Sequence, residues 1–550
     1  MVLTRSKTKT PPLPHPWTGE DYGDGLPPIS IPELVMMAAS NAIREKPEWW
    51  RKMTDPAIVG RWKQEILEES RARSGGNDGA VLRDAQIEYI FKELQWYAQH
   101  RQDQLDQEGV TAPIEYAIDN TRRSDHLIPQ ELKQRFLTCV DKLTNIPDGD
   151  KDWHPGSNNQ VLDIVHPSLF CFVAGRTHVT KEEAIPAFDF IGQGNVAEEV
   201  AESKDVAEMY HSSKYHWLPT DFEVSSDGKV NIKSYINNLH PLEHKDMYPV
   251  LGEIFEYFLP MFEQVLGDML TISPQKQRLD VKPYDWYIEP NYAEAEDEDA
   301  AWEEWHETRV PLFPEIPEFK SIETSPVYNL RNKTLQVIVK MANIELTPEN
   351  PTYNGGTWHV EGMANERIVA TGIYYYKSEN ISTSRLNFRM SVQEPDYEQG
   401  DYTGMKYMYE LENDEPLIQL LDGIVTKEDR CIAFPNIFQH QVQPFELADK
   451  TKTGSRGILV FFLVDPSHPI LSTTHVPPQQ KHWSEPHWML KDAREKMPPE
   501  IFQEIESYVD WPMDLKEAKE HREKLMAERK YFVSETNINM FERPFSLCEH

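Results

Sequence analysis

Two residues in the second half of the chain have the types and the spacing of metal ligands. His359 and Glu361 lie two positions apart in the segment WHVEG. If this segment is a β-strand, both side chains project from the same face. An imidazole beside a carboxylate supplies two of the three ligands of the 2-His-1-carboxylate site that holds non-haem iron. The pair therefore predicts a metal site whose third ligand comes from elsewhere in the chain.

The same His-x-Asp/Glu spacing occurs three times, and the local sequence separates the three places. With 19 His and 91 acidic residues in the chain, about three such triplets are expected by chance. The triplet that begins at His521 lies in a helical pattern, where positions i and i+2 point in different directions. The one that begins at His244 precedes a long apolar helix and is typical of a capping or surface segment. Only the triplet at His359 lies in a predicted strand, directly after two glycines that permit a close backbone approach.

Two residues further along the chain complete the candidate site. In RCIAFPNIFQHQVQPFEL, His440 opens an apolar strand 79 residues (440 − 361) after Glu361, which leaves room for several strands between them. In TGSRGILVFFLVDP, Arg456 shares one face of a strand with Ile458 and Val460. A guanidinium on an inward apolar face needs an anion, because burying it unpaired is very costly. A dicarboxylate cosubstrate would supply that anion.

The order of these motifs resembles that of a known enzyme superfamily. WHxE, then FPxxxxHxVxP, then GxR at the head of an apolar strand is similar to the double-stranded β-helix oxygenases that depend on iron(II) and 2-oxoglutarate, particularly their prolyl-hydroxylase-like members. The likeness covers roughly residues 335–470. The whole chain, including YNGGTWHVEG and IYYYKSENI, further resembles a fungal protein family that is defined only as a domain of unknown function.

The resemblance implies a role for each candidate residue. His359, Glu361 and His440 map onto the iron(II) ligands, and Arg456 maps onto the residue that binds the far carboxylate of 2-oxoglutarate. Tyr353 stands where a tyrosine of nucleic-acid-demethylase-like relatives donates its hydroxyl to 2-oxoglutarate, with a turn or packing role as the alternative. The implied reaction converts 2-oxoglutarate and O₂ to succinate and CO₂ while a substrate is hydroxylated, with desaturation or demethylation as variants.

Two rival interpretations use the same residues. A redox-neutral, cupin-like metalloenzyme needs the three ligands but no cation opposite them, and a non-catalytic binding scaffold needs neither, so Arg456 discriminates among the three. Glu361 also departs from the superfamily, where Asp is commoner at this position. Other polar residues have open roles: Tyr374 and Tyr376 as core or pocket wall, Arg385 and Arg389 as exposed cross-strand charges or anion ligands, and Asn237 and Asn238 as pocket residues or a strand end.

The elements that must position these residues follow from hydrophobic periodicity. Apolar residues recur at helical spacing from Ile31 to about Lys142, and residues 247–270 form a long apolar helix. After about residue 325, short β-rich runs alternate with turn residues, and the chain becomes helical again after Pro477. This pattern predicts an α+β fold with a double-stranded β-helix (jelly roll) core wrapped by N- and C-terminal helices. We expect a flexible leader (1–28), a mixed, mainly helical region (29–320), the oxygenase core (321–480) and a C-terminal helical region (481–550).

Composition narrows the partners and the compartment. The formal net charge of −35 repels phosphate backbones, so nucleic acid is not expected as a partner, and it favours a neutral or cationic substrate. The substrate itself, a small molecule or a protein, is not readable from the sequence. The four cysteines form no CxxC pair, and the chain has no signal peptide and no apolar run of membrane-spanning length. We expect a cytoplasmic protein without a membrane partner; the basic segment RSKTKT is too short to predict a nuclear one.

Overall fold

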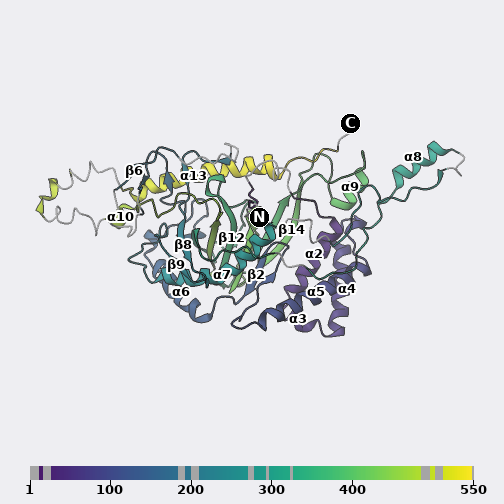
Figure 1. Cartoon of the computed structure of the whole chain (residues 1–550), viewed down its shortest axis with the longest axis horizontal. Coiled ribbons are helices and arrows are strands. Elements are labelled where there is room, and N and C mark those ends of the chain that lie inside the picture. The colour runs from purple at the N-terminus through teal and green to yellow at the C-terminus, as the bar shows by residue number, and fades with distance from the viewer. Residues whose placement is uncertain are drawn as a thin grey trace, which may run out of the picture.

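Helices and antiparallel sheets together make up the chain, as the computed structural model in Figure 1 shows. The structure describes residues 12–16, 26–181, 183, 193–199, 210–270, 278–292, 297–322, 326–484, 496–501, 504 and 512–547. Most of the predicted leader and most of the helical pattern between residues 488 and 509 lie outside these ranges. Within them the predicted mixture of helix and sheet is confirmed.

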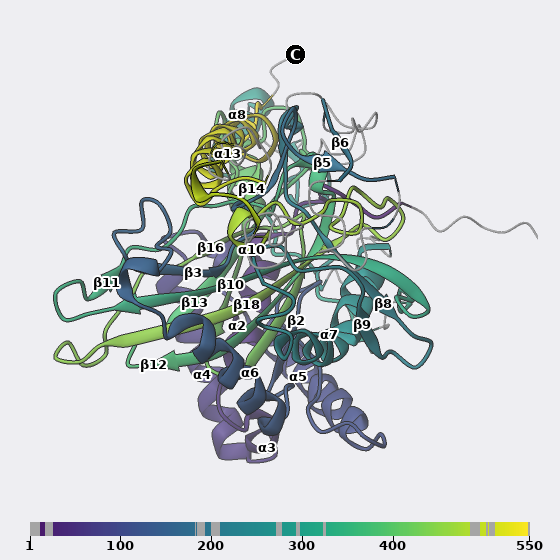
Figure 2. The same ribbon diagram turned by 90° about the vertical axis from the view of Figure 1, so that its left-hand side faces the viewer.

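The central element is a nine-stranded sheet. Its order is β1-β2-β15-β12-β18-β10-β8-β9, and β3 also pairs with β10; every pairing is antiparallel. The long strands β10, β12 and β18 run side by side (Figure 2) and are rich in β-branched and aromatic residues, which favour strands. The strands are β1 (Glu115–Tyr116), β2 (Arg122–Asp125), β3 (Val161–Val165), β8 (Thr220–Val224), β9 (Val230–Ile232), β10 (Lys333–Leu346), β12 (Ile368–Glu379), β15 (Arg430–Pro435) and β18 (Gly454–Val464).

A three-stranded antiparallel sheet, in the order β14-β13-β16, lies against the central sheet. The ring of Phe388 in β13 packs edge-on against Phe434 of β15, with 5.0 Å between centroids. The strands of this sheet are β13 (Ser384–Ser391), β14 (Ile418–Thr426) and β16 (Gln439–Val442). Three two-stranded sheets pair β4 (Phe172–Val173) with β7 (Tyr215–His216), β5 (His178–Val179) with β6 (Asn195–Val196), and β11 (Thr352–Tyr353) with β17 (Phe445–Glu446). The candidate metal ligands and Arg456 lie where the two sheets meet.

Helix α7 (Met247–Leu270) covers the outer face of the central sheet and has the bounds that its apolar pattern predicts. Phe258 packs against Phe461 of β18, with 5.5 Å between ring centroids. A Cβ at Gly372 of β12 would lie 2.8 Å from Phe258, so the helix approaches the sheet more closely than any side chain would allow. Because side chains alternate along a strand, Phe461 on this face places Val460 and Arg456 on the opposite, inner face.

The remaining helices extend the molecule on two sides. Helices α2 to α5 form a hydrophobic cluster of their own at one end, α8 projects beyond the body, and α13 crosses the side opposite the helical cluster (Figure 1). No helix within the described ranges is long and apolar enough to cross a membrane. These helices are α2 (Ile31–Arg44), α3 (Trp49–Lys52), α4 (Pro56–Arg73), α5 (Asp84–Leu105), α6 (Gln130–Thr144), α8 (Glu298–Thr308), α9 (Tyr402–Tyr409), α10 (Lys481–Ser484) and α13 (Leu515–Thr536), with the π-helical turn η7 (Asn537–Phe541) after α13.

Candidate metal centre

A backbone bridge places the two candidate histidines opposite each other on neighbouring segments. His440 of β16 donates its N–H to the carbonyl of His359 at 2.9 Å, and the reciprocal bond measures 3.3 Å. This is an isolated bridge, so the prediction of a regular strand through WHVEG is wrong. The glycines before it explain why: Gly355 has φ +87°, and the N–H of Gly356 reaches the carbonyl of Val442 at 2.9 Å, which ends the ladder early.

The three predicted metal ligands lie together. Glu361 Oε1 is 3.2 Å from Nε2 of His440 and 3.9 Å from Nε2 of His359. The two imidazole rings are 4.4 Å apart, and one donor atom from each of the three residues lies within 4.8 Å of the others. Two imidazoles and one carboxylate at these separations are the donor set of a 2-His-1-carboxylate centre. The structure thus gathers residues that are 79 positions (440 − 361) apart in the sequence.

Hydrogen bonds fix the orientation of two of the three. His359 Nδ1 lies 2.8 Å from the carbonyl of Thr357, which makes Nδ1 the donor and leaves the Nε2 lone pair free for a metal. Asn436, whose side chain is fully buried, accepts from the N–H of Glu361 at 2.8 Å and donates to its carbonyl at 2.9 Å. Sequence analysis missed Asn436, although the Pro-Asn turn ahead of His440 marks its position.

The electrostatics of His359 and Glu361 favour the protonation states that bind metal at neutral pH. Burial, reinforced by the neighbouring His440, lowers the pKa of His359 to about 4. Burial by itself would raise the pKa of Glu361, but the hydrogen bond from His440 and the nearby His359 outweigh it and lower that pKa to about 2. Near pH 7, His359 is therefore neutral and Glu361 is ionised.

Arg456 is a buried guanidinium without an acidic partner among the residues that the structure describes. It is 3 % exposed, and its Nη1 donates to Ser384 Oγ at 2.6 Å across the two sheets. Its Nε has no hydrogen-bond acceptor. The guanidinium carbon lies 5.1 Å from the ring centroid of Tyr375 and 5.4 Å from that of Phe445, and burial lowers the pKa of Arg456. Burying such a charge without a counter-ion is costly.

Tyr353 packs against the same aromatic ring as Arg456. Its ring is 5.2 Å from that of Phe445, which also packs under the Arg456 guanidinium. Burial raises the pKa of Tyr353, and the charge of Arg456 opposes that rise. The hydroxyl therefore stays protonated and can donate a hydrogen bond to an anion held by Arg456.

Four other polar candidates from the sequence have structural roles, two in the core and two in a turn. Tyr374 and Tyr376 pack against Phe136 of α6, on the helix-covered side of the sheet, and belong to the core. Asn237 and Asn238 donate their amides to backbone carbonyls of residues 166–170, so they hold a turn.

The two arginines of β13 differ from each other. Arg385 is 39 % exposed in its side chain, lies 3.4 Å from Asp422 and donates to the carbonyl of Gly423 at 2.8 Å, as expected of an exposed cross-strand charge. The expectation of an exposed charge is wrong for Arg389, which is 5 % exposed and bonded to Gln439 at 2.6 Å and Glu542 at 2.7 Å. The C-terminal segment after η7, which supplies Glu542, covers this residue; strand periodicity alone gives no sign of that cover.

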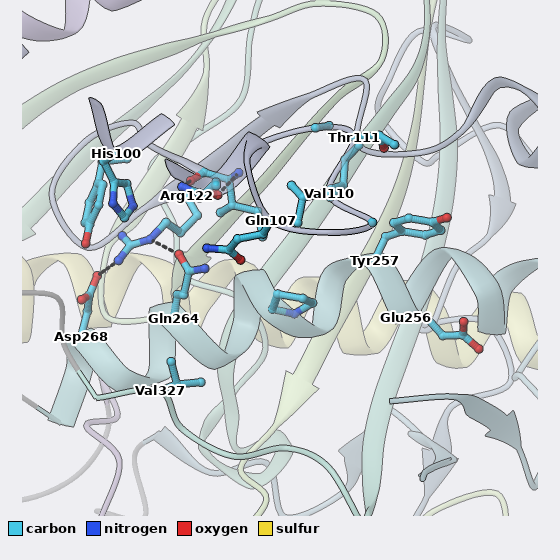
Figure 3. A pocket seen from close by; sticks show the side chains of 17 residues that line it. His100, Gln107, Val110, Thr111, Arg122, Glu256, Tyr257, Gln264, Asp268 and Val327 are labelled. Carbon is cyan, nitrogen blue, oxygen red and sulfur yellow. Dashed lines mark hydrogen bonds and ion pairs between the residues drawn. The ribbon is translucent and has the colours of Figure 1, made fainter. Parts of the chain in front are cut away.

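A cavity of about 510 Å³ lies away from these residues, between the end of α5 and α7 (Figure 3). Within it Arg122 forms an ion pair with Asp268 at 2.6 Å and donates to Gln264 at 2.9 Å. Because this guanidinium already has a carboxylate partner, it offers no free charge to an anion. None of the candidate metal ligands lines the cavity.

Two family models match most of the chain. A family model described as a protein of unknown function, DUF4246, matches residues 84–487, and its N-terminal companion domain matches residues 3–65. The chain therefore belongs to the DUF4246 family, which confirms the expected domain of unknown function. No curated protein matches the sequence.

Solved structures offer only distant likenesses. The chain is similar to IDO from Bacillus thuringiensis (13 % identity, 24 % of this chain and 48 % of that one, TM-score 0.16). It is also similar to the Fe(II)/α-ketoglutarate-dependent dioxygenase TqaL (13 % identity, 28 % and 52 %, TM-score 0.17). A third is a bsmA homologue from Methylobium petroleophilum (9 % identity, 61 % and 86 %, TM-score 0.23). The chain spans about half the length of the first two.

Proposed function

We propose that this protein is an iron(II)- and 2-oxoglutarate-dependent dioxygenase that hydroxylates a substrate still to be identified. In this proposal the two facing sheets form a double-stranded β-helix core. His359, Glu361 and His440 hold the iron, and Arg456 with Tyr353 binds 2-oxoglutarate. Bound iron and 2-oxoglutarate would supply the oxidising chemistry, with succinate and CO₂ as co-products.

The donor set fits iron(II). Two imidazoles and one carboxylate, gathered on one side, leave the remaining coordination positions free for a chelating cosubstrate and O₂. Glu361 in place of the commoner Asp is compatible with this fit, because its Oε1 already lies 3.2 Å from Nε2 of His440. The hydrogen bond from His359 Nδ1 to Thr357 favours the ring tautomer that coordinates through Nε2.

The observation that carries the proposal is the buried guanidinium of Arg456, which has no carboxylate partner among the described residues. Ser384, its only hydrogen-bond partner among the described residues, lies on β13 four residues before Phe388, which pairs with His440. These two positions are about 13 Å apart along the strand. A redox-neutral metalloenzyme has no need of such a buried cation.

The residues of the chain would then divide the work. Arg456 and Ser384 would hold one carboxylate, and Tyr353 would donate to it. The apolar inner-face residues, such as Val460 and Ile458, would keep bulk water from the reacting groups. Asn436 would hold the backbone of Glu361 so that its carboxylate does not swing away from the metal.

The test is anaerobic addition of iron(II) and 2-oxoglutarate to the full chain. A weak visible charge-transfer band, absent with either component alone, is the expected result. The His359→Ala and His440→Ala variants should show no band, and the His468→Ala variant, which alters a His–Asp pair elsewhere in the chain, should show it in full. If wild type binds iron(II) but gives no band and forms no succinate in air, the protein is a different kind of metalloprotein.

A further inference from the structure

A second group of two histidines and one carboxylate lies outside the candidate iron site. His154, Asp163 and His166 each offer one donor atom, and these atoms lie within 4.8 Å of one another. Nδ1 of His154 is 2.8 Å from Oδ2 of Asp163, and the two imidazole rings are 5.1 Å apart. Neither the family comparison nor the proposed oxygenase chemistry uses these residues.

The carboxylate of this group is buried and incompletely bonded. Asp163 lies on β3 and is 6 % exposed, and its Oδ1 has no hydrogen-bond partner. His166 is equally buried. A buried carboxylate oxygen without a donor is costly, so such an atom calls for a cation or a hydrogen-bonding ligand.

A cavity of about 370 Å³ opens onto the group. Asp163 and His166 line it, together with polar side chains that include Asp152, Asn238 and Lys519. The cavity gives an ion a route to the donors and leaves space for a water molecule on the open side. Three protein ligands with one position facing a cavity are the arrangement of an open zinc-type site.

Three existing contacts compete with an ion here, and two of them are long. Nη1 of Arg522 is 3.9 Å from Asp163 Oδ2, but it is held more closely by Asp152 at 2.6 Å. His166 Nδ1 accepts the N–H of Ser168 at 3.2 Å, a long bond that coordination would displace. The 2.8 Å between His154 and Asp163 is a hydrogen bond without metal; tetrahedral ligands bonded at about 2.0–2.2 Å would sit roughly 3.3–3.6 Å apart. This pair would therefore open by roughly 0.5–0.8 Å when an ion binds.

We infer that His154, Asp163 and His166 form a second metal site, which takes a divalent first-row ion of the zinc type with a water on its cavity side. The site is independent of the proposed iron centre, since it shares no residue with it. Asp163 pairs with Ala342 of β10, and His166 follows directly after β3, so both donors stand on the edge of the central sheet. Two imidazoles and one carboxylate are nitrogen and oxygen ligands that zinc accepts.

The experiment measures zinc bound to the full chain at equilibrium, by dialysis against Zn²⁺ and elemental analysis. Wild type should bind about two zinc ions per chain, since both sites accept this ion. The double variant His359→Ala/His440→Ala should retain about one. Adding His154→Ala to that background should weaken the remaining site by more than the roughly 10- to 100-fold that loss of a second-shell partner costs. The His154 side chain is 27 % exposed, so this change spares the buried core.

His468→Ala in the same background is the matched control. His468 and Asp465 have the same Nδ1–Oδ2 distance of 2.8 Å but belong to no three-donor group within the described residues, so zinc binding should not change. The inference is overturned if the His359→Ala/His440→Ala variant binds no zinc. It is equally overturned if His154→Ala and His468→Ala have the same effect. If wild type and the His359→Ala/His440→Ala variant bind equal amounts, the proposed iron centre fails instead.

Discussion

Arg456→Met tests whether the buried guanidinium exists to bind an anion or to hold the fold. Methionine has a similar length but no charge and no hydrogen-bond donors. The substitution removes the 2.6 Å bond to Ser384 and the ring contacts with Tyr375 and Phe445. It also removes a buried charge that has no carboxylate partner among the described residues.

The expected effect on the ligand-free protein is small, because these contributions oppose one another. The hydrogen bond to a charged donor contributes about 1.5–3 kcal/mol and the ring contacts about 1 kcal/mol. Relief from burying an unpaired charge returns several kcal/mol. The free energy of unfolding without ligand should therefore change by less than about 2 kcal/mol in either direction.

The effect on 2-oxoglutarate binding should be large. We expect a loss of roughly 2–4 kcal/mol, or about 30- to 1000-fold in affinity. At a 2-oxoglutarate concentration of 100 Kd, wild type gains about 2.7 kcal/mol of stability from the ligand. At the same concentration the variant should gain less than about 1 kcal/mol, because its ratio of ligand to Kd falls to about 3 or lower. Iron affinity should stay the same, since Arg456 does not contact the metal ligands.

The assay is thermal or denaturant unfolding of both proteins, anaerobically and loaded with iron(II), with and without 2-oxoglutarate. Arg430→Met is the matched control: Arg430 is buried in β15 and paired with Glu45 at 2.8 Å and Asp125 at 2.7 Å. Breaking that network should cost about 3–5 kcal/mol without changing the shift caused by the ligand. If Arg456→Met loses as much stability as Arg430→Met and keeps the full 2-oxoglutarate shift, Arg456 is a structural residue and the reasoning is refuted.

Three further predictions follow from the same contacts. Glu361→Asp keeps the charge but shortens the reach to the metal, so turnover should fall without vanishing; activity equal to wild type in a succinate assay would mean that Glu361 is not a ligand. Asn436→Ala should reduce iron affinity by roughly 10- to 100-fold, measured by titration, as expected for a residue that orients a ligand; unchanged affinity would show that the Glu361 backbone needs no such support. Burial lowers the pKa of His216 to about 4 from 6.5, so its neutral form favours the folded state at pH above 6.5 and this contribution is lost as pH falls towards 4. It amounts to about 3 kcal/mol, and His216→Phe should flatten the stability–pH curve between pH 6.5 and 4; an unchanged slope would show that another group takes up the proton.

Periodicity in the sequence determined the elements. Apolar residues at helical spacing over residues 247–270 predict a helix with too little polar face to stand alone in water, and α7 has those bounds and packs on the sheet. The β-rich runs after residue 325 became strands because branched and aromatic side chains pack well on a pleated sheet. The prediction of a regular strand through WHVEG was wrong. Gly355, just before this segment, has a positive φ, and the pattern of side chains does not reveal such a backbone conformation.

Residue chemistry also determined which side chains were worth considering. His359, Glu361 and His440 stood out because imidazole and carboxylate groups are metal ligands, and Arg456 because an inward charge on an apolar strand needs a partner. These inferences rest on types and on period-two alternation, which are local properties of the chain. Whether the four residues meet is not a local property.

Only the tertiary structure decided what surrounds each of these groups. Asn436 reaches the backbone of Glu361, and Ser384 reaches Arg456, through contacts between segments 72 or more residues apart. Arg389 is buried because the segment after η7 folds over it, although its strand position is that of an exposed residue. His154, Asp163 and His166 come together because a turn returns the chain to β3, at a spacing that matches no short motif. Burial and charge pairing depend on which distant segments pack together, and one stretch of sequence does not specify its neighbours.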